Sequence, residues 1–440
     1  MRVVIQLRPA ADLIAAVADP TVTVAASDVT GKLPGFTLDD VWEPVAVPRP
    51  PTADQAAYSL QPDHASVLVR GEIGDDDSAA LPALSGKRAV AGVFTDPIIQ
   101  PVLTCGGDPA VGSWHDIGTQ LRVEELTAAG LTGKDVALAI VDTGINAAHV
   151  DAVRGGHITI DAGRSWNPPG VTGTPGRFPV EHGSMCAFDA SLAAPQASFL
   201  DIPVLRSTRQ GDSTIDGLLS DALAAYAHLR TVLTDQPAAS RALVVSNSWG
   251  SFSPEWDFPV GQPGNYSDNP SHPFNVIVGS LEAAGADILF AAGNCGRDCP
   301  DGRCGFRDRP ITGANSHPSV LTIGGVDARG QRVGYSSQGP GRLADRKPDI
   351  CTYTHFLGSK VFGEDEPDTG TSAACPVAAG LVAAVRTKWS ATALPPAQLR
   401  TLIHRTAADR GSGGFDYDCG YGIADTAAIL EELRRARNRA

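Results

Sequence analysis

The sequence has few aromatic residues, no long apolar run and an excess of negative charge. Aromatic residues make up 6% of the 440-residue chain, and no apolar run reaches the length of a membrane-spanning helix. Acidic residues outnumber basic residues by 49 to 35, which gives a net charge of −14. This balance favours solubility and disfavours a nucleic-acid backbone or an anionic membrane as the main partner.

The N-terminal sequence lacks the long apolar core of a signal peptide. In MRVVIQLRPAADL, Arg8 and Asp12 interrupt the apolar residues. We therefore expect a cytoplasmic protein without a transmembrane segment. In that compartment the eight cysteines are expected to be thiols or metal ligands rather than a disulfide framework.

The sequence pattern changes near residue 105. Residues 1–105 hold short strand-like runs separated by Pro-rich and acidic stretches, a pattern that predicts a small α+β domain. From about Val123 onward, apolar runs of strand length alternate with amphipathic helical segments. This alternation predicts an α/β fold for residues 106–440, with a doubly wound, mostly parallel sheet and helices on both faces. The expected strands include 135–141, 198–205, 242–246 and 287–291, and the expected helices include 216–233, 275–284 and 373–385.

Polar residues directly follow several of these strands. Asp142 follows the run 135–141, and Asn294 lies just beyond 287–291. His182 opens a helical segment between the first two strands. Because open parallel sheets bind ligands at the carboxyl ends of their strands, we expect these three side chains to converge at one edge.

The segment GTSAACPVAAG, residues 370–380, supplies a fourth polar group. It places Ser372 at or just before the N-terminus of a buried helix, with Pro376 near the first turn. There, unpaired backbone N–H groups can face a developing negative charge. The alternative is that Thr371 or Ser372 only caps a core helix.

These four residues are the set that acyl transfer requires. Ser372 would be the nucleophile, His182 the base that takes its proton, and Asp142 the carboxylate that orients the imidazole. The Asn294 amide and the Ser372 N–H would stabilise the oxyanion. Each residue alone also has a structural explanation: Asp142 as a helix cap, His182 as a core histidine and Asn294 as a turn residue.

Four motifs of the chain resemble those of the subtilisin-like serine proteases, the subtilase family. They are VDTGINAAHVD, HGSMCA, AAGN and GTSAACPVAAG, and they occur in the family's order. The connecting segments APQASFLDIPVL and VVSNSWG are similar as well, so that the resemblance covers roughly Val123 to Ile429. It implies a serine endopeptidase that works through an acyl-enzyme, with Asp142, His182 and Ser372 as triad and Asn294 as oxyanion donor.

The resemblance also implies a polypeptide substrate bound in an extended conformation. The residues expected to line its cleft are Gly211, Ser248, Trp249, Gly250, Ala292 and Gly293. Subtilases often carry a propeptide, and RAVAGVFTDPIIQPV (residues 88–102) weakly resembles its closing strands. Residues 1–105 would then be an intramolecular inhibitor, cleaved near Pro101 to Asp108, or a retained domain that recognises a partner.

The resemblance implies no required cofactor, but it leaves undecided whether calcium or zinc is bound. The short segment from Phe188 to Pro195 leaves no room for the calcium loop of many relatives, so calcium is either unnecessary or bound elsewhere. After Asn294 the insertion CGRDCPDGRCG (residues 295–305) brings three cysteines together. Three states of this cluster are equally open: a zinc site of Cys295, Cys299 and Cys304 with Cys351 or His317 as fourth ligand, a disulfide (Cys295–Cys299 or Cys299–Cys304), or three reduced thiols.

Three other functions are consistent with parts of the sequence. The D-T-G triplets at Asp142 and Asp368 are typical of aspartic proteases, but that class predicts an all-β chain. A catalytically idle subtilase-fold binding module, with its cleft blocked by residues 1–105, would keep the same motifs. A peptide ligase or cyclase would use the same site for acyl transfer to an amine.

Overall fold

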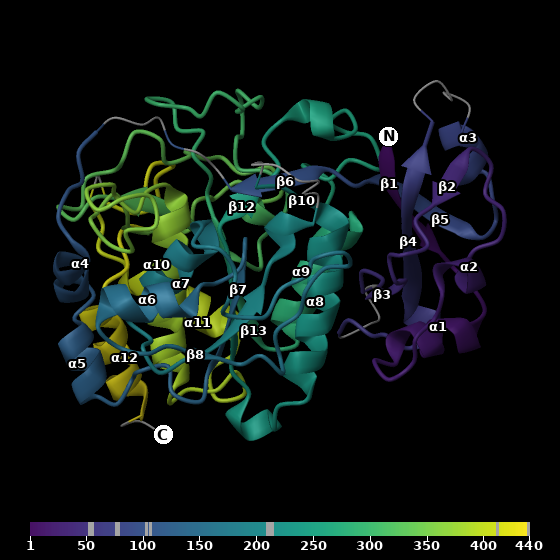
Figure 1. The fold of residues 1–440 in the computed structure, drawn as a ribbon. Helices are drawn as coiled ribbons and strands as arrows, with labels where there is room; N and C mark the ends of the chain where they lie inside the picture. The colour runs from purple at the N-terminus through teal and green to yellow at the C-terminus, as the bar shows by residue number, and fades with distance from the viewer. Residues whose placement is uncertain are drawn as a thin grey trace.

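The computed structural model describes residues 1–51, 57–74, 80–101, 104, 108–207, 215–410 and 413–437. The larger part of the chain is built on a seven-stranded sheet (Figure 1). Its order is β15-β14-β13-β11-β7-β9-β8, and every neighbouring pair is parallel. The predicted doubly wound α/β fold is thereby confirmed. The strands are β7 (Ala137–Val141), β8 (Thr159–Ile160), β9 (Ser198–Ile202), β11 (Leu243–Asn247), β13 (Ala286–Ala291), β14 (Leu321–Val326) and β15 (Ile350–Tyr353).

Helices cover both faces of this sheet. On one face lie α7 (His182–Ser191) and α10 (Thr371–Arg386), which share an apolar cluster with α4, α5, α6, α11 and α12. On the other face lie α8 (Leu219–Thr234) and α9 (Pro273–Ala283). Strands buried on both sides explain the continuous apolar runs of the sequence. The remaining helices are α4 (Trp114–Gln120), α5 (Val123–Ala128), α6 (Ala147–Arg154), α11 (Pro396–Thr406) and α12 (Thr426–Arg437). No helix of the described residues is long and apolar enough to span a membrane.

The N-terminal part forms a separate antiparallel sheet. Its order is β2-β4-β1-β5, and β3 also pairs with β4. One face of this sheet packs against α8 and α9, because Trp42, Val47 and Leu68 belong to the same apolar cluster as those helices. The predicted boundary after residue 105 lies outside the described residues. The elements are β1 (Arg2–Leu7), α1 (Ala11–Ala18), α2 (Ala26–Val29), β2 (Phe36–Leu38), β3 (Val45–Pro48), β4 (Ala65–Ile73), α3 (Ala80–Ser85) and β5 (Val90–Thr95).

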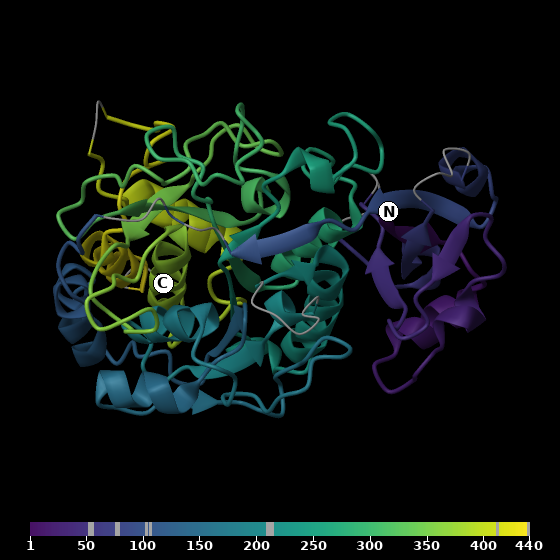
Figure 2. The ribbon, with the colours of Figure 1, turned by 45° about the horizontal axis from the view of Figure 1, so that its top comes forward.

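One strand of the N-terminal part leaves its own sheet and joins the larger part. This strand, β6 (Ile98–Pro101), lies between β10 (Gly217–Leu218) and β12 (Trp249–Gly250) in a three-stranded antiparallel sheet. In Figure 2 it extends from the N-terminal part across the larger part. The sequence indicates no such strand exchange, because a strand of four residues, Ile-Ile-Gln-Pro, does not specify its partners.

Candidate active site

Asp142 and His182 are held together at the end of β7. Asp142 follows the strand's last residue, and His182 is the first residue of α7. The imidazole Nδ1 lies 2.8 Å from Asp142 Oδ1 and 3.0 Å from Oδ2. Thr143 links the two segments, since its hydroxyl accepts a hydrogen bond from the Gly183 N–H at 2.8 Å. Both side chains are buried, at 1% exposure for Asp142 and 7% for His182, so the carboxylate fixes the ring with little competition from water.

Ser372 is the second residue of α10 and contacts Ser248 twice. Its hydroxyl donates to the Ser248 carbonyl oxygen at 3.3 Å, and the Ser248 hydroxyl donates to the Ser372 carbonyl oxygen at 3.0 Å. In a regular helix the Ser372 carbonyl would accept from the residue four positions on, but that residue is Pro376, which has no N–H. Pro376 thus lies inside the helix, in its second turn rather than in the predicted first turn.

The Asn294 side chain is fixed against the start of α10. Its side-chain oxygen accepts hydrogen bonds from the Thr371 N–H at 2.9 Å and the Thr371 hydroxyl at 3.0 Å. A Cβ atom added to Gly370 would lie 2.8 Å from the Asn294 amide nitrogen, and Gly370 has φ +79°. Only glycine combines this backbone conformation with the available space.

A buried thiol lies between the His182 and Ser372 segments. Cys186 Sγ is 3.6 Å from Asp142 Oδ2, 3.8 Å from His182 Nδ1 and 3.6 Å from the Ser372 carbonyl oxygen. Burial and the nearby Asp142 carboxylate raise the pKa of this thiol well above its usual value, so Cys186 is a neutral S–H group, as expected for a small buried residue. No hydrogen bond between described side chains joins His182 to Ser372, but one sulfur atom touches both segments.

A model of the subtilase family matches residues 133–422. The chain belongs to the subtilase family. It is therefore a serine endopeptidase, a hydrolase of peptide bonds. Subtilisin DY from Bacillus licheniformis is 25% identical over 312 residues, which cover 70% of this chain and 96% of that protein. Mycosin-1 from Mycolicibacterium smegmatis is 33% identical over 168 residues, 34% of this chain and 37% of that one.

Two solved structures show the same fold. Fervidolysin from Fervidobacterium pennivorans, described as a keratinolytic enzyme related to subtilisin, aligns with a TM-score of 0.60 and 16% identity. That alignment covers 98% of this chain and 60% of fervidolysin. MycP1 from the ESX-1 type VII secretion system aligns with a TM-score of 0.50 and 20% identity, over 77% of this chain and 92% of that one. At these identities the likeness establishes the fold alone.

Among the residues expected to line the cleft of this subtilase, Ser248 to Gly250 lie beside Ser372 and β6. Ser248 touches Ser372, and Trp249 and Gly250 pair with β6 through their backbones. The indole of Trp249 is fully buried and donates to the Val141 carbonyl oxygen at 3.0 Å. The Trp249 side chain therefore packs in the core, and only the backbone of Trp249 is available to pair with an extended strand.

The other expected cleft residues lie deeper or cannot be placed. Ala292 and Gly293 are buried in the segment that connects β13 to Asn294. The Gly293 N–H donates to the Thr371 hydroxyl at 3.0 Å, so this segment supports the start of α10. Gly211 lies outside the described residues.

A pair of buried carboxyl groups also connects α7 to the segment before Ser372. Asp368 accepts hydrogen bonds from the Ser359 N–H at 2.6 Å and the Ser359 hydroxyl at 2.5 Å, and it lies close to the buried carboxyl group of Asp189 in α7. Burial is the main cause that raises the pKa of Asp368 to about 6 and that of Asp189 well above its usual value. The nearby charge of Asp368 also raises the pKa of Asp189. The D-T-G triplet at Asp368 thus has a structural role, although the sequence did not reveal its partner.

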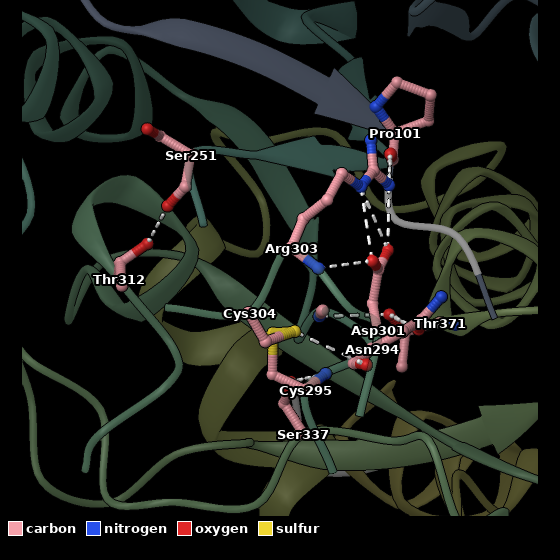
Figure 3. Close-up of a disulfide and its surroundings, with 11 residues drawn as sticks. Pro101, Ser251, Asn294, Cys295, Asp301, Arg303, Cys304, Thr312, Ser337 and Thr371 are labelled. Carbon is pink, nitrogen blue, oxygen red and sulfur yellow. Dashed lines mark hydrogen bonds and ion pairs between the residues drawn. A yellow bond between two sulfur atoms is a disulfide. The ribbon is translucent and has the colours of Figure 1, made fainter. Parts of the chain in front are cut away.

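The cysteine cluster of this subtilase is oxidised. Cys295 and Cys304 form a disulfide (Figure 3), and Cys299 is also disulfide-bonded. The predicted pairings Cys295–Cys299 and Cys299–Cys304 are therefore wrong. The alternatives of three thiols and of a zinc site do not hold for this oxidation state, because a disulfide sulfur has no thiolate to offer a metal. Spacing alone could not give the pairing, since the fold of the insertion decides which cysteines meet.

Proposed function

We propose that the endopeptidase uses Ser372 as nucleophile, His182 as general base, Asp142 as orienting carboxylate and Asn294 as oxyanion donor. The observation that carries this proposal is the contact between His182 Nδ1 and the Asp142 carboxylate at 2.8 Å, next to a serine at a helix N-terminus. With Nδ1 bound to Asp142, the other ring nitrogen, Nε2, is the one that can take the serine proton.

The proposed reaction follows from these positions. Ser372 Oγ attacks the carbonyl carbon of the scissile bond while His182 Nε2 removes the hydroxyl proton. The carbonyl oxygen becomes an oxyanion and is stabilised by the Asn294 amide and the Ser372 N–H. The protonated His182 then gives its proton to the leaving amine, and an acyl-enzyme forms. Water, activated in turn by His182, hydrolyses the ester and restores Ser372.

Strand β6 supports a role for the N-terminal part as an intramolecular inhibitor. It lies antiparallel between β10 and β12, and β12 directly follows Ser248, which contacts Ser372. An extended peptide substrate would have to take the same place to reach the nucleophile. We therefore propose that residues 98–101 occupy the cleft as a substrate does, and that cleavage within the predicted range Pro101 to Asp108 precedes activity.

Hydrolysis of an unfolded protein by the full chain tests this function. Wild type should cleave it after processing, and Ser372→Ala should lower the rate by several orders of magnitude. Mass spectrometry of the products separates hydrolysed peptides from the joined peptides of a ligase or cyclase. A full-length band that stays intact and inactive would instead support the idle binding module.

Compartment and metal requirement stay predictions. The Cys295–Cys304 disulfide argues against the predicted cytoplasmic location, because disulfides persist in oxidising compartments. We propose an oxidising compartment, which thiol counting on natively purified protein would test. No cofactor takes part in the proposed steps. Thermal unfolding with and without a chelator would decide whether calcium is bound.

A further inference from the structure

The cysteine-rich insertion after Asn294 takes no part in the proposed catalytic steps, but it contacts a residue that does. The Asp301 N–H donates to the Asn294 carbonyl oxygen at 2.9 Å, and the Gly305 N–H donates to the Phe252 carbonyl oxygen at 3.0 Å. The Cys295–Cys304 disulfide closes the insertion into a loop. The loop is therefore anchored to the oxyanion donor itself, as Figure 3 shows.

Arg303 extends from this loop to the strand in the cleft. Its Nη1 donates to the side-chain oxygen of Gln100 at 2.5 Å, and its Nη2 donates to the Pro101 carbonyl oxygen at 3.1 Å. The second contact is to a backbone carbonyl, so any substrate could make it. The first depends on the side chain at the position of Gln100, so only this contact can select among sequences.

Asp301 holds Arg303 in this orientation. Arg303 Nη2 donates to Asp301 Oδ2 at 2.8 Å, and the Arg303 N–H donates to Asp301 Oδ1 at 2.9 Å. The Asp301 side chain is only 5% exposed, whereas that of Arg303 is 30% exposed. The guanidinium is thus positioned before a peptide arrives, which lowers the entropic cost of binding. Because Asp301 offsets part of its charge, the site suits a neutral amide as well as a carboxylate.

The strand register shows where such a side chain would lie in a substrate. Pro101 is opposite Trp249, and Gln100 is opposite Gly250. A substrate in the same register has its next residue opposite Ser248, which contacts Ser372. That residue carries the carbonyl to be attacked and is P1, so the Gln100 position is P3.

We propose that Arg303 is a specificity-determining residue that selects glutamine or glutamate at P3 of the substrate. The inference rests on the proposed function, since it treats β6 as a substrate analogue. A hydrogen bond to a charged donor at a partly exposed site predicts about a tenfold advantage in kcat/KM for Gln or Glu over Ala. Lysine at P3 is expected to be worse than Ala, because its charge repels the guanidinium.

Quenched fluorescent peptides based on Ile-Ile-X-Pro-Val-Leu, with X as Gln, Glu, Ala or Lys, test the proposal on the processed full chain. Wild type should rank Gln and Glu about tenfold above Ala. Arg303→Ala should cleave all four with little discrimination, and Arg303→Glu should move the preference to Lys. Arg307→Ala, which removes an exposed arginine just beyond the loop, should keep the wild-type ranking.

Two results would overturn the proposal, and they are distinguishable. If the Arg303 variants cleave with the wild-type ranking, Arg303 is not a specificity residue, although the endopeptidase function stands. If neither wild type nor any variant cleaves a peptide and Ser372 cannot be labelled, the proposed function fails and the inference fails with it. Arg303→Lys keeps the charge without the fork of donors, and it should retain part of the preference for Glu but lose that for Gln.

Discussion

The Ser248 hydroxyl donates a hydrogen bond to the Ser372 carbonyl oxygen at 3.0 Å, which replaces the helix N–H that Pro376 cannot supply. The residue next to the cleft strand β12 thus completes the first turn of the helix that carries the proposed nucleophile. In the proposed active site, this pair links substrate binding to the position of the nucleophile.

Ser248→Ala should therefore lower the stability of the protein. The buried Ser372 carbonyl would lose its hydroxyl donor, at a cost of about 1–2 kcal/mol in the free energy of unfolding. Pro376→Ala restores a backbone N–H at the position where a helix needs it, so the cost of Ser248→Ala should be smaller in that background. A double-mutant cycle by denaturant unfolding measures this coupling. Strict additivity of the two substitutions would contradict the assigned role of Ser248.

Gly370→Ala should reduce catalysis far more than binding. The new methyl would press on the Asn294 amide nitrogen, at 2.8 Å, and displace the oxyanion donor. We expect kcat to fall by about 10²–10³-fold, as for loss of one oxyanion donor. Gly155→Ala is the matched control, because Gly155 also has a positive φ of 67° but has open space around its Cβ position. It should cost some stability and leave kcat unchanged.

The attachment of the N-terminal part should depend on pH through two buried groups, Asp96 and His272, whose effects on stability have opposite signs. His272 lies at this interface, because its Nε2 is 3.1 Å from the Thr95 carbonyl oxygen. Asp96 accepts from the Ser220 N–H and hydroxyl at the start of α8, at 2.7 and 2.8 Å. Burial raises the pKa of Asp96 from 3.8 to about 6, so stability from this group is lost as pH rises from about 4 to 6. Burial lowers the pKa of His272 from 6.5 to about 4, so stability from this group is lost as pH falls through the same range.

When either group is replaced, the dependence of the free energy of unfolding on pH should reflect the remaining group. Each group contributes about 3 kcal/mol across its range. In a Ser372→Ala background, which prevents processing, Asp96→Asn should gain stability with rising pH more steeply than its parent between pH 4 and 6. His272→Gln should shift the slope the other way. Thermal unfolding at several pH values measures both, and slopes equal to that of the parent would argue against buried titrating groups at this interface.

Loss of the Cys295–Cys304 disulfide should reduce selectivity at P3 more than it reduces the rate of cleavage. The double variant Cys295→Ser, Cys304→Ser opens the loop that carries Arg303, at a cost of about 2–3 kcal/mol in stability. We expect discrimination between Gln and Ala at P3 to fall toward one, while peptides are still cleaved at Ser372. A variant that keeps full discrimination would show that the loop holds Arg303 without the disulfide.

The sheet and the main site residues could be predicted from the sequence for a physical reason. Strands buried on both faces are continuous apolar runs, as in β7 and β13. Asp142 directly follows β7, Asn294 lies just beyond β13, and His182 begins a helix, so the parallel topology brings them to one edge.

The remaining features depend on contacts between distant segments. The run Ile98–Pro101 does not show that it pairs with β10 and β12, and Arg303 looks like any charged loop residue. The direction of the Trp249 side chain follows from strand register, which the motif does not specify. The buried carboxyl groups of Asp189 and Asp368 come together only because α7 lies beside the segment that precedes α10.

Covalent labelling by a fluorophosphonate probe tests the role of Ser372 most directly. The probe reacts with a serine only when a base removes its proton and the oxyanion is stabilised. On the processed chain, peptide mapping by mass spectrometry should find a single adduct on Ser372, lost in His182→Ala and strongly reduced in Asn294→Ala. An adduct on another residue, or a Ser372 that stays unlabelled once the N-terminal part is removed, would contradict the proposed active site.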